Sequence, residues 1–122
     1  MIHRCSKCKI TKPVSEFRKD NRRISGLQSW CISCGSISKK NKRKQNKQKA
    51  VDYKGGCCKR CGIVSECLDI YDFHHINPNE KEDSLNRLMN STWEYIVPEL
   101  DKCDLLCSNC HKITHWEIRN NL

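Results

Sequence analysis

Four Cys-x-x-Cys pairs constrain this 122-residue chain more than any other feature of its sequence. They are Cys5/Cys8, Cys31/Cys34, Cys58/Cys61 and Cys107/Cys110. Pairs with this spacing form tight turns, and two such pairs together supply the four thiolates of a structural zinc site. Because only 37% of the residues are hydrophobic, one large apolar core is not expected, and bound metal is the natural additional source of folding energy.

Disulfides are the alternative use of so many cysteines. The total of eleven cysteines is odd, and residues 1–4 contain no apolar run of the kind found in secretion signals. We therefore expect a reducing, cytoplasmic compartment and two structural zinc ions, one bound by the first two pairs and one by the last two. No stretch is long and apolar enough to span a bilayer, so no membrane partner is expected.

Positive charge is concentrated in the N-terminal half of the chain. Residues 1–56 hold 16 Lys and Arg against three acids, a balance of +13, whereas residues 57–122 hold seven against eleven, a balance of −4. Such asymmetry is typical of a nucleic-acid-binding arm joined to another domain. The expected contacts to DNA phosphates are Arg22, Arg23, Lys39, Lys40, Lys42, Arg43, Lys44, Lys47 and Lys49.

Three segments follow from these patterns. Residues 1–35 are expected to form a four-cysteine zinc-finger module, residues 36–56 a basic helix or linker, and residues 57–122 a second zinc-stabilised unit. Residues 36–53 contain neither Pro nor Gly, which favours a single helix, although a solvated linker or a helix that forms on DNA is the alternative. Gly55 and Gly56 mark the expected boundary.

The second unit is predicted to be a small α+β fold. Residues 68–73 and 104–106 are rich in β-forming side chains and predict two short strands. Between them we expect a polar loop over residues 74–83 and helices over 84–89 and 92–100, the latter weakened by Pro98. A C-terminal helix that begins at Ser108 or Asn109 would place His111 and His115 on one face.

Four of the five histidines fall into two pairs, each beside an element that zinc would hold. His74 and His75 lie between the last two cysteine pairs, whereas His111 directly follows the final zinc cysteine and His115 comes four residues later. A lone histidine is usually a surface or core residue. Two pairs at these positions are harder to explain as ordinary structural residues, because each lies beside an element that a bound metal would hold in place.

These motifs resemble the HNH, or ββα-metal, endonuclease family, in the subtype whose catalytic motif lies between two zinc-binding pairs. The resemblance covers roughly residues 57–116 and rests on Cys58-Lys-Arg-Cys61-Gly, Phe73-His-His-Ile-Asn-Pro78 and Lys102-Cys-Asp-Leu-Leu-Cys-Ser-Asn-Cys-His111. The first module resembles, less specifically, a small zinc finger of phage and bacterial proteins that often accompanies HNH domains. That resemblance rests on Cys5-Ser-Lys-Cys8, Ser15-Glu-Phe17, Gly26-Leu-Gln-Ser-Trp30-Cys31 and Cys34, followed by the lysine-rich run.

The resemblance implies a role for each histidine of the second unit. His74 and His111 would hold one catalytic divalent ion, which could be Mg²⁺, Mn²⁺, Ni²⁺ or Zn²⁺, and imidazole ligands favour the softer of these ions. His115 would be a further metal ligand or a phosphate contact. His75 would be the general base that activates water.

One position departs from the family pattern. The middle asparagine of the family, which orients the base, is replaced here by Lys102. Asp101, Asp104 or a backbone carbonyl are the candidates to orient His75 in its place.

The expected function is that of a metal-dependent DNA endonuclease, which nicks or cuts both strands of double-stranded DNA. It would act as a monomer or transient dimer in a bacterial cell or phage-infected host, with the basic arm holding the DNA. The first alternative is a non-enzymatic, zinc-stabilised DNA-binding regulator that retains the HNH fold, and the second is a binder or nuclease directed at RNA. The intact histidines favour the nuclease, whereas Lys102 favours the regulator.

Overall fold

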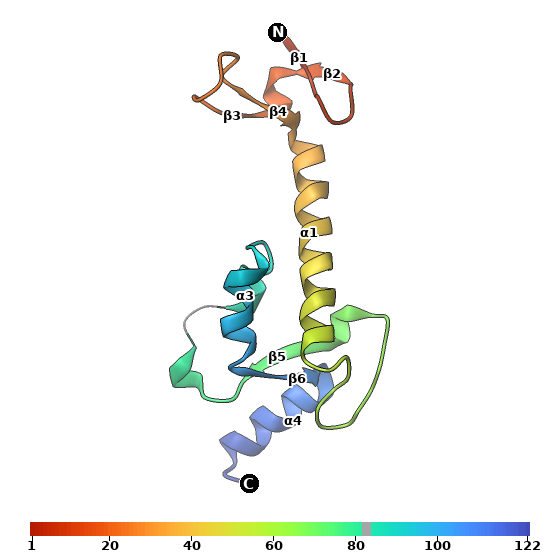
Figure 1. The fold of residues 1–122 in the computed structure, drawn as a ribbon, viewed down its shortest axis with the longest axis vertical. Helices are drawn as coiled ribbons and strands as arrows, with labels where there is room; N and C mark the ends of the chain where they lie inside the picture. The colour runs from red at the N-terminus through yellow and green to blue at the C-terminus, as the bar shows by residue number, and fades with distance from the viewer. Residues whose placement is uncertain (82–83) are drawn as a thin grey trace. The chain divides into compact units, whose positions relative to one another are not determined.

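The computed structural model describes residues 1–81 and 84–122 of the chain (Figure 1). It divides into two compact units, Met1–Lys42 and Arg43–Leu122, and the division falls inside helix α1 (Ile32–Tyr53). In the described part of the chain, no helix is both long and apolar enough to cross a membrane.

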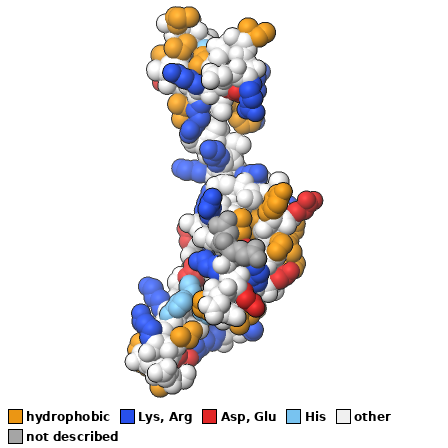
Figure 2. All heavy atoms as spheres, turned by 90° about the vertical axis from the view of Figure 1, so that its left-hand side faces the viewer, with side chains coloured by type: hydrophobic (Ala, Val, Ile, Leu, Met, Phe, Trp, Pro, Cys, Tyr) orange, Lys and Arg blue, Asp and Glu red, His pale blue; other side chains and the backbone are white. Residues whose placement is uncertain are grey.

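Helix α1 carries the basic run. Its Lys39, Lys40 and Lys42 side chains are exposed, and Figure 2 shows Lys and Arg side chains, in blue, standing out along this helix. The helix ends before Gly55 and Gly56, whose φ angles of +103° and +73° lie in the left-handed region that glycine adopts without strain. These two glycines, which the sequence marks as a boundary, therefore terminate the helix.

The second unit contains one antiparallel hairpin and short helices around it. Its elements after α1 are η2 (Leu68–Ile70), β5 (Tyr71–His75), η3 (Pro78–Glu80), α2 (Leu85–Leu88), α3 (Trp93–Leu100), β6 (Cys103–Cys107) and α4 (Ser108–Arg119). Strands β5 and β6 pair in register from Tyr71 opposite Cys107 to His75 opposite Cys103. Helices α3 and α4 both contact this hairpin and lie on either side of it in Figure 1.

Alternation along β5 sends neighbouring side chains to opposite faces of the hairpin, as in any strand. Tyr71 and Phe73 pack into buried apolar clusters on one face. Asp72 and His74 lie on the other face, where they meet histidines of α4. This alternation determines how the candidate site is arranged.

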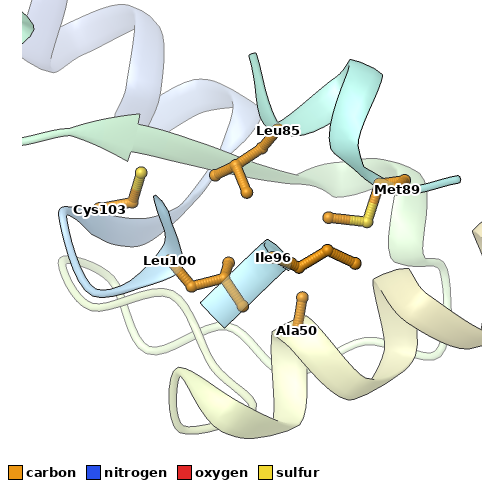
Figure 3. Packing of buried hydrophobic residues seen from close by; sticks show 6 residues of the cluster. All are labelled: Ala50, Leu85, Met89, Ile96, Leu100 and Cys103. Carbon is orange, nitrogen blue, oxygen red and sulfur yellow. The ribbon is translucent and has the colours of Figure 1, made fainter. Parts of the chain in front are cut away.

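A buried apolar core joins α1 to α2 and α3 (Figure 3). The side chains that point toward one another are Ala50, Leu85, Met89, Ile96, Leu100 and Cys103. Buried Asn46 on α1 donates from Nδ2 to the carbonyl oxygens of Met89, at 2.7 Å, and Ser91, at 3.1 Å. Because this amide bonds to the segment between α2 and α3, it holds both short helices against α1.

The first unit consists of two small hairpins. Its elements are β1 (Ile2–Arg4), β2 (Thr11–Pro13), η1 (Val14–Glu16), β3 (Phe17–Lys19) and β4 (Leu27–Cys31), followed by the start of α1. Phe17 lies opposite Cys31 in the second ladder, and both residues pack with Cys5 in a small buried cluster. A cluster of this size is a minimal core, so ligands that cross-link it contribute much of its stability.

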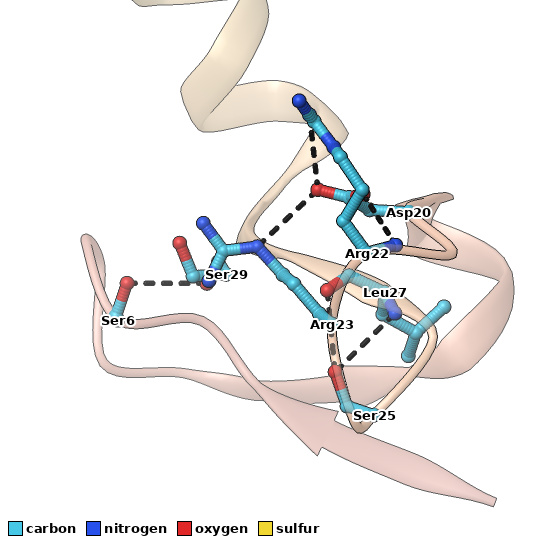
Figure 4. A network of polar contacts seen from close by, with 7 residues as sticks. All are labelled: Ser6, Asp20, Arg22, Arg23, Ser25, Leu27 and Ser29. Carbon is cyan, nitrogen blue, oxygen red and sulfur yellow. Dashed lines mark hydrogen bonds and ion pairs between the residues drawn. The ribbon is translucent and has the colours of Figure 1, made fainter.

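Asp20 organises the turn between β3 and β4 (Figure 4). Its carboxylate accepts a hydrogen bond from the Arg22 backbone amide at 3.1 Å and pairs with the guanidinium groups of Arg22, at 3.1 Å, and Arg23, at 3.3 Å. The Arg22 hydrogen bonds hold the pKa of the Asp20 carboxyl below its usual range. Two of the arginines predicted to contact DNA are thus arranged on one exposed turn.

The small α+β class is confirmed, with local differences from the predicted elements. Residues 68–70 form a 3-10 turn, and β5 continues through both histidines, so the predicted loop begins later than residue 74. Residues 82–83 at the end of that predicted loop lie outside the described residues. The sequence predicts no strands in the first unit. Strands β1, β2 and β3 have only three residues each and carry no alternation that can be recognised, and the five-residue β4 is not predicted either. Pro98 is accommodated inside α3.

Candidate metal centres and active site

The first four-cysteine cluster joins the hairpins of the first unit to the start of α1. Its members are Cys5, Cys8, Cys31 and Cys34, and their sulfur atoms all lie within 4.8 Å of one another. The Sγ atoms of Cys5 and Cys34 are 3.9 Å apart, close to the edge of about 3.8 Å expected for a tetrahedron with Zn–S bonds near 2.3 Å. The backbone amides of Cys8 and Cys31 donate to the Cys5 sulfur at 3.5 and 3.2 Å. These residues fit one zinc ion.

The second cluster joins the turn after α1 to the junction of β6 and α4. Its members are Cys58, Cys61, Cys107 and Cys110, again with all sulfur atoms within 4.8 Å. The Sγ atoms of Cys61 and Cys107 lie 3.7 Å apart, and the amides of Cys61 and Cys110 donate to the sulfurs of Cys58 and Cys107 at 3.5 and 3.4 Å. These residues also fit one zinc ion, so the chain has two four-cysteine clusters that are compatible with two structural zinc ions.

The acidities of these thiols show why each cluster suits a cation. Burial raises the pKa of the Cys5 and Cys58 thiols. Hydrogen bonds from backbone amides to each sulfur outweigh this effect and bring both pKa values down to about 6. Hydrogen bonding to Cys31 raises the pKa of Cys34 to about 12, and burial raises the pKa of Cys110 to about 12. Four crowded sulfurs therefore resist complete ionisation by themselves. A divalent cation removes that conflict, because it binds thiolates and offsets their mutual repulsion.

Three cysteines remain outside the two clusters. Cys103 is buried in the apolar core and Cys57 is half-buried beside Cys58, whereas Cys67 is exposed. A cysteine that binds no metal is usually a small buried hydrophobic residue, which describes Cys103 but not exposed Cys67. It lies at the surface, directly before η2.

A third cluster is formed by His74, His111 and His115. One ring nitrogen from each lies within 4.8 Å of the others, and the Nε2 atoms of His111 and His115 are 3.0 Å apart. Metal–nitrogen bonds near 2.1 Å give ligand separations of about 3.0 to 3.4 Å in octahedral or tetrahedral sites, so the spacing fits one divalent ion. Burial and the neighbouring histidines lower the pKa of His74, which favours the neutral form that binds metals.

Asp72 orients this cluster. Its Oδ2 atom lies 3.1 Å from Nδ1 of His111, so the carboxylate accepts a hydrogen bond from that nitrogen and turns Nε2 toward His115. A carboxylate behind a ligating imidazole fixes the tautomer and raises the basicity of the ligand. The role of Asp72 was not foreseen from the sequence. Its position two residues before His74, on the same face of a strand, is the signal that could have revealed it.

The histidine cluster is open to solvent and lies beside two hollows that are lined partly by Lys and Arg side chains. His115 is exposed, whereas His74 and His111 are half-buried. A hollow of about 770 Å³ is lined by Asp72 and His111 together with Arg43, Lys44 and Lys47 of α1. A second hollow of about 340 Å³ is lined by His74 and Thr114 together with Lys59 and Arg60. In Figure 2 a histidine surface, in pale blue, lies next to Lys and Arg side chains.

His75 lies apart from the metal-binding cluster. Its Nε2 atom is 2.8 Å from Oε2 of Glu99 on α3, and its side chain is only 11% exposed. Asp104 instead pairs with Lys59 at 2.9 Å, and Asp101 accepts a hydrogen bond from the Tyr53 hydroxyl. The carboxylate that contacts the proposed base is therefore one that the sequence did not indicate.

The predicted DNA-contacting residues divide into two groups. Arg22, Arg23, Lys39, Lys40, Lys42, Lys44 and Lys49 are exposed. Arg43 instead bonds to the carbonyl and side-chain oxygens of Asn86 at 2.8 and 2.6 Å, and half-buried Lys47 donates to the Tyr71 carbonyl at 2.7 Å. Burial lowers the pKa of Lys47. These two cations stabilise the second unit as well as adding positive charge.

Comparisons with protein-family models, with curated proteins and with solved structures found no match for this chain. The functional argument therefore depends on the site geometry described above.

Zinc content tests the two cysteine clusters. We expect two tightly bound zinc ions per chain, measured by inductively coupled plasma mass spectrometry after gel filtration with a mild chelator. Cys58→Ser removes one thiolate ligand and should reduce the content to one ion. Cys67→Ser changes an exposed cysteine outside both clusters and should leave the content at two. A wild-type content of one or less would contradict the two-site architecture.

Asp72→Asn tests the orientation of the histidine cluster. Asparagine preserves the size of the side chain but removes the charge behind His111, so affinity for a third divalent ion should fall by about 10- to 100-fold. Isothermal titration of Ni²⁺ into the zinc-loaded protein measures this affinity. Asp69→Asn, which changes an exposed neighbour, is the matched control and should have no effect. Equal affinities in the two variants would mean that Asp72 does not support the site.

Proposed function

We propose that the chain is a metal-dependent endonuclease of the HNH type that hydrolyses phosphodiester bonds of double-stranded DNA. The observation that carries this proposal is the combination of two metal-binding clusters around one helix. The first turn of α4 contributes Cys110 to a four-cysteine cluster, and the next residue, His111, belongs to the open three-histidine cluster.

The two kinds of cluster suit different tasks. Four sulfur ligands complete a zinc coordination shell and leave no position for a substrate. Three protein ligands leave positions for a phosphate oxygen and for water, which is the arrangement of catalytic sites. Because His115 is exposed and the cluster opens toward two hollows, a phosphodiester could reach these positions.

The chemistry follows from this arrangement. A divalent ion held by His74, His111 and His115 would neutralise charge on the scissile phosphate and stabilise the departing oxygen. His75 accepts a proton from a water molecule, and the resulting hydroxide oxygen bonds to phosphorus as the bond to the 3′ oxygen breaks. The 3′ oxygen takes a proton from solvent, which leaves a 5′-phosphate and a 3′-hydroxyl end.

The charge distribution supports DNA as the substrate. The segment from residue 57 onward carries a net charge of −4, so that segment does not attract DNA over long distances. The excess of +13 in residues 1–56 can supply phosphate contacts, and exposed Lys39, Lys40 and Lys42 lie on one continuous helix. One active site cuts one strand at a time, so a double-strand break would need dimerisation or a second binding event.

A non-enzymatic DNA-binding protein with the same metal-stabilised fold is the second candidate. The observation that favours it is the near-burial of His75 and its hydrogen bond to Glu99, which a purely structural ion pair would also produce. The two candidates share the basic arm and the zinc sites, so activity measurements distinguish them.

Plasmid cleavage tests the nuclease. We expect the full chain to convert supercoiled plasmid to nicked or linear DNA with added Mn²⁺, Ni²⁺ or Mg²⁺. His75→Ala should reduce the rate by about 10²- to 10⁴-fold, because it removes the general base, while DNA affinity in a mobility-shift assay stays unchanged. His3→Ala, which changes the histidine that packs edge-to-face against Phe17 in the first unit, should keep the activity.

The outcomes separate the two candidates. Equal cutting by wild type and His75→Ala would refute the assigned base. A wild-type protein that binds plasmid but cuts with none of these metals would support the non-enzymatic candidate, and a preference for RNA substrates would reassign the nucleic acid.

Salt dependence of binding tests the basic helix. Changing Lys39, Lys40 and Lys42 together to Gln preserves helix-forming side chains but removes three positive charges. If all three contact phosphates, the slope of log K against log[salt] should become shallower by about 2.7, at roughly 0.9 per contact. Arg119→Gln, at the end of α4, should leave the slope unchanged. An unchanged slope in the triple variant would exclude these lysines from the DNA interface.

A further inference from the structure

Glu99 is the only charged side chain among the described residues that is buried, with 4% of its surface exposed. A buried carboxylate destabilises a fold unless both of its oxygen atoms have partners. Here Oε2 lies 2.8 Å from Nε2 of His75, and Oε1 lies 3.0 Å from the ammonium group of Lys102. The carboxylate therefore lies between the proposed base and the lysine that replaces the family asparagine.

We propose that Glu99 is the positioning residue of His75. Its carboxylate accepts the hydrogen bond of Nε2–H, so the tautomer of His75 is fixed and the lone pair of Nδ1 is left to accept a proton from water. The same carboxylate stabilises the imidazolium that forms when His75 takes up that proton, as the aspartate of a serine-protease triad does for its histidine. This inference rests on the proposed nuclease function.

The surrounding contacts hold this pair in place. Glu99 is fixed by α3, whose Ile96 and Leu100 side chains are fully buried in the core. The backbone carbonyl of Lys102 accepts a hydrogen bond from the Ile76 amide at 3.0 Å, so the chain directly after His75 is tied to the segment that follows α3. Lys102 thus does not orient the base directly. Its ammonium group holds the carboxylate that does so.

The contact between Glu99 and His75 also explains how His74 and His75 can have separate roles although they are adjacent in the sequence. Because alternate residues of a strand face opposite sides, His74 reaches the histidines of α4 while His75 reaches α3. A positioning group for His75 must therefore come from the α3 side of the hairpin. Glu99 is the residue whose contact with His75 meets that requirement.

Steady-state cleavage of supercoiled plasmid by the full zinc-loaded chain with Mn²⁺ tests this role. Glu99→Gln keeps the shape of the side chain but offers a neutral amide, and kcat should fall by about 10²- to 10⁴-fold. KM for plasmid and affinity for Ni²⁺ should change by less than about twofold, since neither DNA contacts nor metal ligands are altered. Glu99→Asp, which restores a carboxylate, should recover at least part of the lost kcat.

Two further variants separate positioning from general stability. The double variant Glu99→Gln/His75→Ala should be no slower than His75→Ala alone, because both changes remove the same function. Asp101→Asn changes a neighbouring carboxylate that contacts Tyr53 rather than His75, and it should retain wild-type kcat. Full activity in Glu99→Gln, or losses that multiply in the double variant, would overturn the positioning role while leaving the nuclease intact.

If Glu99→Gln does not fold, a measurement on the wild-type protein tests the positioning role of Glu99 instead. Nitrogen-15 NMR of the labelled imidazole should show His75 with its proton on Nε2. A proton on Nδ1 instead would overturn the proposal, because Glu99 would then face a nitrogen without a hydrogen. A wild-type protein that cuts no plasmid with any metal would refute the nuclease and the positioning role together, a result different from the failure of the Glu99 variants alone.

Discussion

The second four-cysteine cluster is the interaction on which the rest of the second unit depends. It joins the turn at Cys58 and Cys61 to Cys107, whose sulfur lies 3.7 Å from that of Cys61 although the two residues are 46 positions apart. Cys107 is also the last residue of β6 and the N-cap of α4, and its sulfur accepts the Cys110 amide. A metal ion at this point would close a long loop and fix the direction in which α4 leaves the hairpin. His111 follows Cys110 directly, so the cluster also places the first histidine of α4 against β5.

Because side chains alternate along β5, the candidate metal ligands and His75 lie on opposite faces of the hairpin. On the α4 side, Asp72 and His74 meet His111, and the group is open to solvent between two hollows lined partly by cations. On the α3 side, His75 meets a buried carboxylate in a largely dry environment. Metal binding requires open coordination positions, whereas positioning of a base requires a restricted side chain. A single short strand can serve both because its neighbouring residues never share a face.

Helix α1 also has two roles, because some of its side chains stabilise the second unit and others present positive charge to solvent. Arg43 and Lys47 form hydrogen bonds with Asn86 and Tyr71, and Asn46 bonds to the segment between α2 and α3. The exposed lysines on the same helix supply positive charge to solvent. A truncation that removed residues 1–50 would therefore remove part of the second unit's core together with the basic arm.

Some features of this protein follow from the local spacing of residues along the chain. Cys-x-x-Cys pairs identify the two four-cysteine clusters, and the i and i+4 relation of His111 and His115 predicts that they share a helix face. The groups that support these residues are set instead by the fold. Asp72 and Glu99 are ordinary acids in the sequence, and their roles arise from the register of β5 against β6 and from the packing of α3, which bring together residues separated by 39 and 24 positions. Such long-range pairing depends on how the whole unit folds around its second four-cysteine cluster, so spacing along the chain does not determine the partner of either acid.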